Sequence, residues 1–493
     1  MLAELGIDAT TFVLLGLALL MALSFEFVNG FHDTANAVAT VIYTHTLKPV
    51  YAVVWSGLCN LLGVLTSAGT VAFGIIALLP VELVLNVGSG AGFAMVFALL
   101  TSAIIWNVGT WYLGLPASSS HTLIGSIVGV GLMNSYMSPD SAFGDGVNWA
   151  KVADTGKALL FSPIFGFVLA AGLLLLLRAV IKSNALFESP KGEEPPPPAV
   201  RGLLFLTCTL VSFFHGSNDG QKGMGLIMLI LIGIAPVGFA LDLGTDAGSL
   251  QRIQAAATVV QAGLAPAGSP TLDEAAARKA LTQFLKLKKA DANTLPALAQ
   301  ANSSVIAGLQ GVKSLNDVPQ DKRRDLRMDI YMVSTGLKLL SKSGKLPTGL
   351  DKKAADDYTK DLGAVTSFIP TWVKVVVAIA LGLGTMIGWK RIVVTVGEKI
   401  GKAHLTYGQG ASAELVAAAT IGAADWFGLP VSTTHVLSSG IAGTMVANKS
   451  GVQGDTIRNV LLAWVLTLPV CVLLGAMTFA AGLFLVFRVL GMH

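Results

Sequence analysis

The chain has 493 residues, of which 53% are hydrophobic and only 13% are charged, and its mean hydropathy is +0.69. Soluble domains carry roughly 25% charged residues, so the composition excludes an ordinary soluble protein and indicates a polytopic membrane protein. The formal net charge of +4 is small for this length and argues against nucleic acid as a partner. A P-loop signature is missing, which argues against ATP-driven transport by this chain alone.

Apolar runs recur along the whole chain. The run at 11–28 lacks the basic region and the cleavage site of a removable signal peptide, so we expect it to be retained as a span. Cys59, Cys208 and Cys471 lie within apolar runs, which predicts small buried side chains and not a disulfide or a metal site. A span needs about 20 apolar residues. With half-helices at 122–133 and 436–446, we expect about ten to twelve crossings, at 11–28, 51–79, 91–115, 159–180, 203–213 with 225–241, 372–389, 411–426 and 461–490.

Basic residues are concentrated in two connecting loops. Residues 178–201 and 390–402 hold four Lys or Arg each, whereas residues 1–10 hold none. By the positive-inside rule the two loops are cytoplasmic and the termini lie outside. The proline run at 195–198 is interpreted as a stiff linker between two halves, with recognition by an SH3-type domain as the alternative.

A block of polar groups interrupts the first span. Residues 29–36 read N-G-F-H-D-T-A-N, and a second block, F-H-G-S-N-D-G at 214–220, interrupts a later apolar stretch. Charged and amide side chains at membrane depth cost roughly several kcal/mol unless they face protein or a wet cavity. The two blocks therefore predict an ion or substrate site with Asp33 and Asp219 as its carboxylates. A structural hydrogen-bonding role for either aspartate is the alternative.

A second pair of motifs indicates an internal repeat. Residues 114–121 read G-L-P-A-S-S-S-H and residues 428–435 read G-L-P-V-S-T-T-H. In the first half the histidine of this motif follows the histidine of the polar block by 89 residues, whereas the second half has 220. The polar stretch 242–368 is 127 residues long, and without it the second spacing falls to 93. Two copies of one unit therefore surround an insert, as in transporters built from inverted repeats.

These observations predict the fold class and the division of the chain. We expect an all-α polytopic membrane protein of two inverted repeats with broken helices, plus one soluble helical insert. The loop at 390–402 is cytoplasmic and the run before it crosses once, so we expect the insert outside. The expected units are transmembrane repeat 1 at 1–181, a cytoplasmic Pro-rich linker at 182–201, the first part of transmembrane repeat 2 at 202–241, the insert at 242–368, and the second part of repeat 2 at 369–493.

Each of the four motifs places polar residues with glycine or proline where a helix would begin inside the membrane. Exposed N–H groups and the positive end of a helix dipole suit an anion. Hydroxyl and amide donors can surround a small tetrahedral oxyanion. The expected substrate-binding residues are Asp33, Asn36, Ser118, Ser119, Ser120, Asn218, Asp219, Ser432, Thr433 and Thr434.

The two carboxylates of this set indicate a second ligand. Asp33 and Asp219 would repel a doubly charged anion unless a proton or a cation compensates. Binding of the anion and of H⁺ or Na⁺ should therefore be coupled, which is the physical basis of symport. Glu26, on the helix that enters the first polar block, is a further candidate on the cation path.

Other polar and small residues near the motifs have structural interpretations. His121 and His435 are expected to orient their loops, and Glu414 and Asp425 to lie at helix ends or to hydrogen-bond within the second repeat. Any single hydroxyl of the Ser and Thr clusters can instead cap a helix or join packed spans. Four glycines are expected to permit close helix packing: Gly125, Gly129, Gly440 and Gly443.

With all four motifs in view, the sequence resembles the inorganic phosphate transporter (PiT) family, and in detail the bacterial low-affinity Pit-type phosphate permeases. The family pattern G-A-N-D-x-A-N-A corresponds to G-F-H-D-T-A-N-A at 30–37 and, less closely, to G-S-N-D-G-Q-K-G at 216–223. The match covers essentially the whole membrane part. The resemblance implies secondary active uptake of phosphate between the paired motifs. The family's Asp and Asn positions fall on Asp33, Asn36, Asn218 and Asp219, and its hydroxyls on 118–120 and 432–434.

Two departures from the family pattern change the chemistry of the motifs. His32 stands where the pattern has Asn, and Lys222 stands where the second copy often has Asn. An ammonium group at Lys222 could replace the charge of a sodium ion, and His32 could carry a proton. We therefore expect coupling to H⁺ over Na⁺, with Glu26, His32, Asp33, Asp219 and Lys222 as the coupling-ion residues. The resemblance to permeases regarded as proton symporters of neutral metal–phosphate complexes points the same way.

The expected function is a symporter that imports inorganic phosphate, as the free anion or as a metal–phosphate complex, coupled to H⁺. The alternatives are a Na⁺-coupled phosphate symporter, a carrier of sulfate or arsenate, and a non-transporting receptor with the insert as its sensor. An ionised Asp33 or Asp219 can accept a hydrogen bond from the proton that phosphate retains and sulfate lacks. We do not expect an enzyme, a cofactor, a resident metal or a nucleic-acid partner. The expected surroundings are the lipid of the bacterial cytoplasmic (inner) membrane, and a homodimer is left open.

Overall fold

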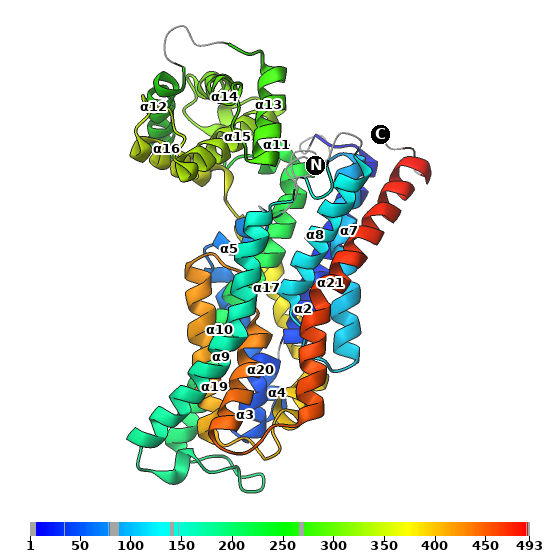
Figure 1. Ribbon diagram of the computed structural model, residues 1–493, viewed down its shortest axis with the longest axis vertical. Helices are drawn as coiled ribbons and strands as arrows, with labels where there is room; N and C mark the ends of the chain where they lie inside the picture. The colour runs from blue at the N-terminus through cyan, green and yellow to red at the C-terminus, as the bar shows by residue number, and fades with distance from the viewer. Residues whose placement is uncertain are drawn as a thin grey trace.

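The computed structural model describes residues 6–33, 35–76, 78, 88–138, 142–145, 147–265, 271–489 and 491, apart from the side chains of residues 35, 36 and 151. In this part of the chain the regular structure is helical, with one isolated β-bridge between Gly401 and Val452. Figure 1 shows a long bundle of helices with a separate group of helices at one end. The expected all-α class is confirmed.

The first half of the bundle begins with a long helix and its continuation. The first polar block covers the last residues of this helix and the first residues of its continuation, on either side of residue 34, which lies outside the described residues. The helices of this half are α2 (Ala9–Asp33), α3 (Ala35–Tyr43), α4 (Pro49–Thr66), α5 (Thr70–Ile76), α7 (Gly90–Tyr112), α8 (Ser119–Met137) and α9 (Trp149–Val180).

The second half repeats most of this order after the 3-10 turn η1 (Asn184–Leu186) and the proline run. Its helices, with the insert between α11 and α17, are α10 (Pro198–Ile234), α11 (Pro236–Phe239), α17 (Thr371–Ile387), α18 (Lys390–Val394) with the π-helical turn η4 (Thr395–Lys399), α19 (Tyr407–Trp426), α20 (Thr433–Ala447), and α21 (Gly454–Phe484) with the π-helical turn η5 (Leu485–Val489).

Six helical segments in the described ranges are long and apolar enough to cross a membrane, or up to seven if α17 counts with the bent helix before it. They are α2 with α3, α4, α7, α9, α10, and α21 with η5. The expected count of about ten to twelve also included α8, α19 and α20. These three helices are rich in Gly, Ser, Thr and Ala and are mostly buried inside the bundle. Because they contact other helices more than lipid, they need little hydropathy of their own.

Helices of the two halves pack in matching pairs. α4 packs along α10 and α2 packs along α17, while α8 packs along α21 and α20 packs along α9. Each pair joins one helix of the first half to one of the second half. When every helix is replaced by its counterpart in the other half, the α4–α10 pair becomes the α17–α2 pair, and the α8–α21 pair becomes the α20–α9 pair. This is the pattern that two related repeats would produce. Their inverted relation stays a prediction.

Glycines let the backbones of these pairs touch. A Cβ on Gly129 of α8 would lie 2.0 Å from the carbonyl oxygen of Val472, and one on Gly443 of α20 would lie 2.2 Å from that of Phe167. A Cβ on Gly125 would lie 2.8 Å from the Cβ of Cys471. The predicted packing role is confirmed for these three glycines. At Gly440 the added Cβ would make only ordinary contacts of 3.5 Å.

The second polar block does not break its helix. α10 continues without interruption through residues 214–220. A Cβ at Gly216 would lie 2.2 Å from the carbonyl oxygen of Asn60, and a Cβ at Gly223 would lie 2.2 Å from Cγ of Glu26. The glycines here therefore permit close approach of α4 and α2. The expectation that a helix begins at this block is wrong.

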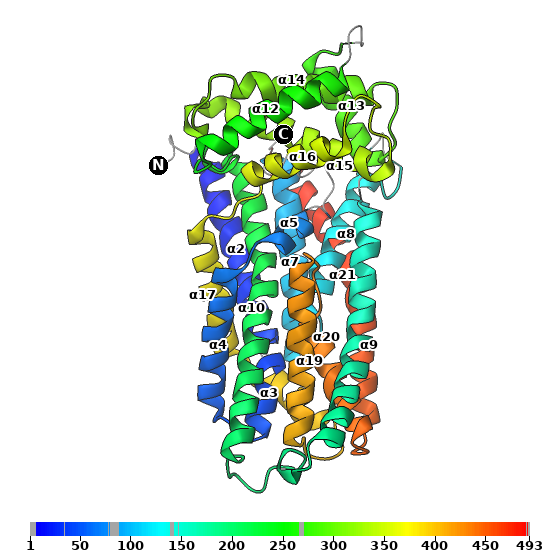
Figure 2. The same cartoon turned by 90° about the vertical axis from the view of Figure 1, so that its left-hand side faces the viewer.

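Two helical hairpins enter the bundle from opposite ends. α7 and α8 come from the end that carries the insert, and α19 and α20 come from the other end (Figures 1 and 2). α2 begins and α21 ends at the insert end, whereas the connection from α9 to α10 lies at the opposite end (Figure 1). This arrangement agrees with a topology in which the termini and the insert share one side of the membrane. Which side faces out stays a prediction.

The insert is a helical unit with a hydrophobic core of its own, separate from the two core clusters of the bundle. In this core Tyr358 donates its hydroxyl to Oδ1 of Asn302 (2.7 Å). The three native cysteines lie in the bundle and are free and buried, as expected. The helical character predicted for 242–368 is confirmed. Its helices are α12 (Ala247–Leu264), α13 (Glu274–Leu287), α14 (Thr294–Leu309), α15 (Arg323–Ser343) and α16 (Lys352–Thr366).

Candidate functional site

The tips of the two hairpins are shaped by glycine and capped by serine. Gly114 and Gly428 follow α7 and α19 with φ of +67° and +64°, a backbone conformation that glycine adopts without strain. Ser118 and Ser432 then cap the next helices, because their hydroxyls accept from the backbone N–H groups three residues later (3.2 and 3.1 Å). α8 and α20 thus begin inside the bundle. Their positive dipole ends adjoin the central polar residues.

The two motif histidines join the tips to each other. The rings of His121 and His435 lie 4.8 Å apart, and His435 stacks on Trp464 at 4.0 Å. Trp464 in turn donates Nε1–H to the carbonyl of Pro116 (2.8 Å). These contacts agree with the expected loop-orienting role of the two histidines.

Asp33 is the point at which three helices meet. It is 1% exposed at the end of α2, and Ser119 of α8 donates a hydroxyl to its Oδ2 (3.0 Å). Thr434 of α20 donates a hydroxyl to Oδ1 of the same carboxylate. Both hairpins therefore send one hydroxyl to one aspartate of the first polar block.

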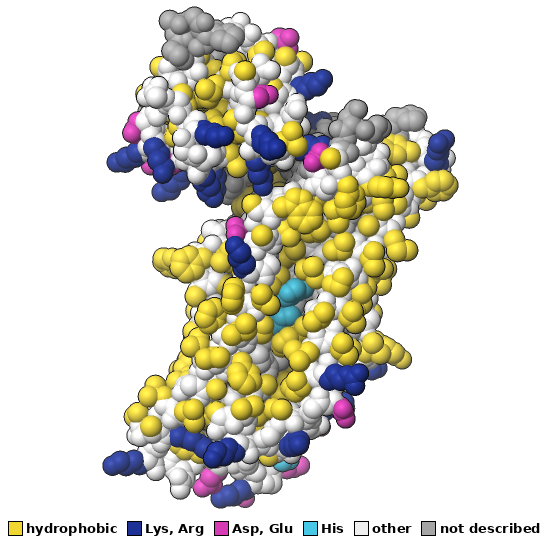
Figure 3. Space-filling model, viewed as in Figure 1, with side chains coloured by type: hydrophobic (Ala, Val, Ile, Leu, Met, Phe, Trp, Pro, Cys, Tyr) yellow, Lys and Arg dark blue, Asp and Glu magenta, His cyan; other side chains and the backbone are white. Residues whose placement is uncertain are grey.

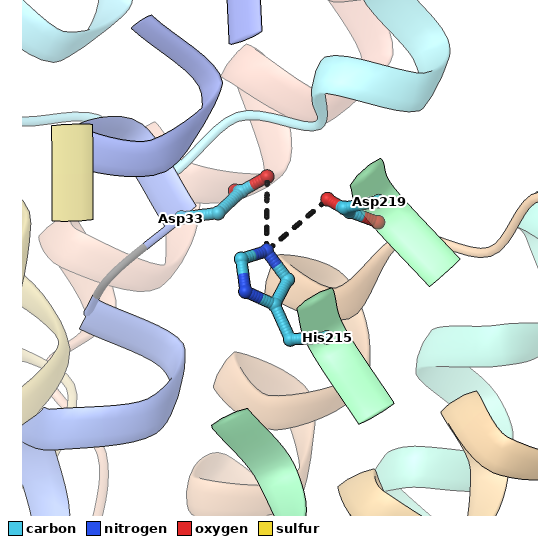
Figure 4. A group of neighbouring side chains, drawn as sticks. All are labelled: Asp33, His215 and Asp219. Carbon is cyan, nitrogen blue, oxygen red and sulfur yellow. Dashed lines mark ion pairs between the residues drawn. The ribbon is translucent and has the colours of Figure 1, made fainter. Parts of the chain in front are cut away.

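His215 lies between the two predicted aspartates. Its Nε2 is 3.2 Å from Oδ2 of Asp219, one helical turn further along α10, and 3.9 Å from Oδ2 of Asp33 (Figure 4). Its Nδ1 lies 3.2 Å from Oδ1 of Asn60, whose amide donates to the hydroxyl of Thr385 (3.0 Å). The imidazole is fully buried, so Nε2 faces the two carboxylates and not solvent.

Lys222 closes the cluster on the other side. Its ammonium group lies 2.9 Å from Oδ2 of Asp219 and donates to the hydroxyl of Ser119 (3.0 Å). The Lys222 side chain is 1% exposed, and Glu26 is fully buried against Gly223, the next residue of α10. One lysine and one histidine therefore face the two central aspartates. A buried cluster of this kind requires paired charges and does not persist with isolated ones.

The remaining predicted residues lie around this cluster in different roles. Asn218 donates to the carbonyl of Leu429 (3.3 Å), and Ser120 donates to the carbonyl of Val431 (3.0 Å), so both hold the tip of the second hairpin. His32 lies beside Asp33, with Nδ1 at 3.6 Å from Oδ1. Thr433 is 2% exposed at the start of α20. The side chain of Asn36 lies outside the described residues.

His215 is the residue that the sequence interpretation left out of the site. Its signal was present, because His215 and Asp219 are four residues apart and share one face of any continuous helix. The assumption of a broken helix at this block removed that relation. From the sequence alone, His215 serves only to measure the spacing between the motifs.

Asp425 and Glu414, for which we expect structural roles, both form hydrogen bonds between helices. Asp425, at the end of α19, accepts hydrogen bonds from Ser217 (2.6 Å) and Gln221 (2.5 Å) of α10, as expected within the second repeat. Glu414 differs, because it lies in the middle of α19 and accepts from Thr40 of α3 as well as from Thr207 of α10. Its link to the first repeat was not expected.

The cluster can bind a cation or a proton as well as an anion. Asp33, His215 and Asp219 each offer one ligand atom, and these atoms lie within 4.8 Å of one another. Oδ1 of Asp219 and Oδ1 of Asn218 have no hydrogen-bond partner among the described residues, so two buried acceptors are unused. The helix ends and hydroxyls beside them supply donors. Groups of both signs thus converge on one buried volume.

A bundle of membrane-spanning helices with a buried charged site at its centre, approached by hairpins from both ends, defines a membrane transporter. The model of the Phosphate transporter family matches residues 29–475. The chain therefore belongs to the phosphate transporter family, and it is a transporter and not an enzyme.

Individual relatives support the assignment along the whole chain. The low-affinity inorganic phosphate transporter PitA of Escherichia coli (strain K12) is 43% identical over 490 residues, covering 95% of this chain and 97% of the relative. A probable low-affinity inorganic phosphate transporter of Bacillus subtilis (strain 168) is 28% identical over 94% of this chain and 95% of the relative. A solved structure described as the sodium-dependent phosphate transporter has a TM-score of 0.52 and 19% identity, covering 95% and 98% of the two chains. That likeness shows a shared fold.

Proposed function

We propose that this protein is a symporter that imports inorganic phosphate across the bacterial inner membrane together with H⁺. Membership of the phosphate transporter family supports the substrate, as do the names of relatives such as PitA. The observation that carries proton coupling is the position of His215 Nε2, 3.2 Å from Asp219 and 3.9 Å from Asp33. A proton held there neutralises part of the charge that would otherwise repel phosphate.

The proposed binding mode assigns different tasks to the groups around the cluster. The hydroxyls of Ser119 and Thr434 turn from Asp33 to donate to phosphate oxygens, and the N–H groups at the starts of α8 and α20 donate beside them. Oδ1 of Asp219 accepts the hydrogen of protonated phosphate, which sulfate cannot supply. The ammonium group of Lys222 pairs with Asp219, in the role that a sodium ion would otherwise have. A more highly charged form of phosphate then requires an additional proton on the protein to compensate its charge.

Coupling follows from the electrostatics of the cluster. With the proton, Lys222 and His215 balance the charges of Asp33 and Asp219, so the cluster repels phosphate less; without the proton, Lys222 alone faces the two carboxylates and phosphate meets net negative charge. Each ligand therefore strengthens the binding of the other. Such reciprocal coupling typically amounts to about 1–3 kcal/mol.

Transport of a metal–phosphate complex is the second candidate. It rests on Asp33, His215 and Asp219, whose ligand atoms lie within 4.8 Å of one another. Carboxylate oxygens with one imidazole suit a divalent cation of intermediate hardness. In this version the metal ion is cargo that enters with phosphate.

Uptake by purified protein in proteoliposomes separates these candidates. We expect labelled phosphate to accumulate under an inward pH gradient in sodium-free, chelator-treated buffer. A strict sodium requirement would overturn proton coupling. Uptake that returns only when Mg²⁺, Mn²⁺ or Zn²⁺ is added, with stoichiometric entry of the metal, would establish the second candidate instead. Arsenate should compete with phosphate and sulfate should not.

A further inference from the structure

The charge of the chain is unevenly distributed. The insert at 242–368 contains 17 of the Lys and Arg residues and 13 of the Asp and Glu residues. The remainder of the chain has 16 of each kind, so the whole formal net charge of +4 belongs to the insert. A folded unit with this excess of basic residues can present one surface that is entirely positive.

That surface is the outward face of α15. Positions three, four and seven apart share one face of a helix, and on one face of α15 basic residues recur at these spacings, interrupted by uncharged ones such as Met328 and Thr335. The two carboxylates of the helix, Asp325 and Asp329, point to another side and bind Arg278 of α13 at 3.2 and 3.3 Å. The outward face carries the exposed Arg324, Lys338 and Lys342, with the partly buried Arg327 and Tyr331 beside them, and no acidic residue.

The start of α15 is fixed to the junction between the insert and the bundle. Arg323 donates to the carbonyl of Val237 in α11 (2.9 Å), and Arg327 donates to the carbonyls of Ala240 (2.5 Å) and Thr366 (2.8 Å), where the chain enters and leaves the insert. Because Arg327 belongs to the outward face, that face is turned toward the bundle side of the insert and away from its far surface.

The level of the membrane surface is given by two aromatic residues at the same junction. Phe239, at the end of α11, and Trp372, at the start of α17, have ring centroids 6.1 Å apart, and Trp372 is 44% exposed. Exposed tryptophan at the end of an apolar helix is typical of the headgroup level of a bilayer. α15 therefore starts at about the depth of the headgroups.

The other end of the basic face also points to the bundle. Lys288, after α13, donates to Oδ1 of Asn148 in the connection before α9. Lys288 lines one surface hollow together with Lys342 and Lys345 at the end of α15. Figure 2 shows α15 and α16 as the layer of the insert nearest the bundle, and Figure 3 shows Lys and Arg side chains along that underside.

We propose that the outward face of α15, with Lys288 and Lys345 at its far end, binds anionic lipid headgroups of the bilayer that holds the protein. Basic side chains within a Debye length of a negative lipid surface are attracted to it, and the attraction grows with each Lys or Arg. The lipid contact holds the insert at one distance from the membrane.

The neighbouring helix α16 provides a matched control. Its exposed lysines, Lys352, Lys353 and Lys360, are interleaved with Asp356 and Asp357, so the helix presents both signs. Replacing three lysines there changes the net charge as much as replacing Arg324, Lys338 and Lys342 does. Arg327 is kept in both variants because it ties α15 to the bundle.

The test is amide hydrogen exchange of the full chain in nanodiscs of phosphatidylcholine alone or with phosphatidylglycerol. We expect exchange in 323–345 to slow by about fivefold or more with phosphatidylglycerol at low salt, and the difference to vanish at high salt. R324Q/K338Q/K342Q should abolish the difference, whereas K352Q/K353Q/K360Q should keep it.

Three results would overturn the proposal. The first is equal exchange in both lipids for the unaltered chain. The second is loss of the difference in the α16 variant as strongly as in the α15 variant, which would show a response to net charge alone. The third is protection of α15 by inorganic phosphate added to phosphatidylcholine nanodiscs, which would make the face a collector of free anions. Melting temperatures of both variants identify any general loss of folding.

Discussion

At the scale of single residues, the central site depends on His215 as much as on the two aspartates that the sequence singled out. The imidazole faces both carboxylates and its second nitrogen is fixed by Asn60. A glutamine at this position would keep one polar contact but could not hold a proton between Asp33 and Asp219. The pairing of opposite charges inside the bundle would be lost.

We therefore expect His215→Gln to reduce phosphate uptake by at least about tenfold, because the reciprocal coupling of proton and anion is removed. The matched control is His404→Gln, which replaces an exposed histidine before α19. Initial rates in proteoliposomes under a pH gradient measure both. Uptake by His215→Gln at the rate of the control, with the same pH dependence, would exclude the assigned role.

A second residue-scale prediction concerns the buried pair of Lys222 and Asp219, 2.9 Å apart. Removing one partner of a buried ion pair costs about 3–5 kcal/mol, because the other charge remains without compensation. Lys222→Met should lower the melting temperature of the purified protein more than the double variant Lys222→Met with Asp219→Asn does. Equal melting temperatures for the two variants would contradict the pairing, and both should lack uptake.

The sequence predicted the residue types of the site better than their roles. Asp33, Asp219, Lys222, Ser119 and Thr434 do converge, because intramembrane charges must find partners. Ser118 and Ser432 instead cap helices. Which hydroxyl caps and which reaches the centre depends on the exact register of each helix start. A motif of three consecutive hydroxyl residues contains no such information.

At the scale of helices, close packing between the two halves is set by glycine. The carbonyl of Val472 faces Gly129, and the carbonyl of Phe167 faces Gly443 in the matching pair. The same logic explains the incorrect prediction of a break in α10. Glycine at 216 and 223 looks like a helix breaker in sequence, and only the neighbouring helices show that it admits a backbone and a side chain.

Substitution of these glycines tests the helix pairs. Gly129→Ala and Gly443→Ala should each destabilise the bundle by about 1–3 kcal/mol or more, since the new methyl group would overlap a carbonyl. Gly172→Ala, with no atom within 4 Å of its added Cβ, is the control and should be neutral or slightly stabilising. Melting temperatures in one detergent compare the three. Similar losses at 129 and 443 would also support the predicted repeat.

Within the insert, one carboxyl makes folding depend on pH. Burial raises the pKa of Asp329 to about 6, although Arg278 opposes the shift. Because the folded form holds the proton more tightly than the unfolded form does, the stability that Asp329 contributes is greatest below its unfolded pKa and is lost as the pH rises through about 6.

We therefore expect α13 and α15 to open more readily at pH 7.5 than at pH 5. Amide exchange of the full chain, corrected for intrinsic rates, measures this opening. Asp329→Asn should remove most of the difference, whereas Asp325→Asn, on the same helix and beside the same arginine, should keep it. An unchanged pH dependence in Asp329→Asn would assign the effect to other groups.

At the scale of the whole molecule, spacing between motifs was the most informative feature of the sequence. It predicts that 242–368 is an addition to one of two copies, and the helices of that stretch do form a unit with its own core. Hydropathy was less informative, because it cannot distinguish a helix that crosses lipid from one that enters the bundle as half of a hairpin. Buried α8 and α20 interleave their apolar side chains with Gly, Ser and Thr for that reason.

The orientation in the membrane is the remaining prediction at this scale. The insert and the linker lie at opposite ends of the bundle (Figure 1), and the basic linker is expected in the cytoplasm. Lys313→Cys in the insert and Lys191→Cys in the linker introduce exposed thiols, while Cys59, Cys208 and Cys471 are buried and should not react. An impermeant maleimide added to intact spheroplasts should label Lys313→Cys and spare Lys191→Cys until the membrane is lysed. The reverse pattern would invert the topology and place the lipid-binding face of α15 on the cytoplasmic leaflet.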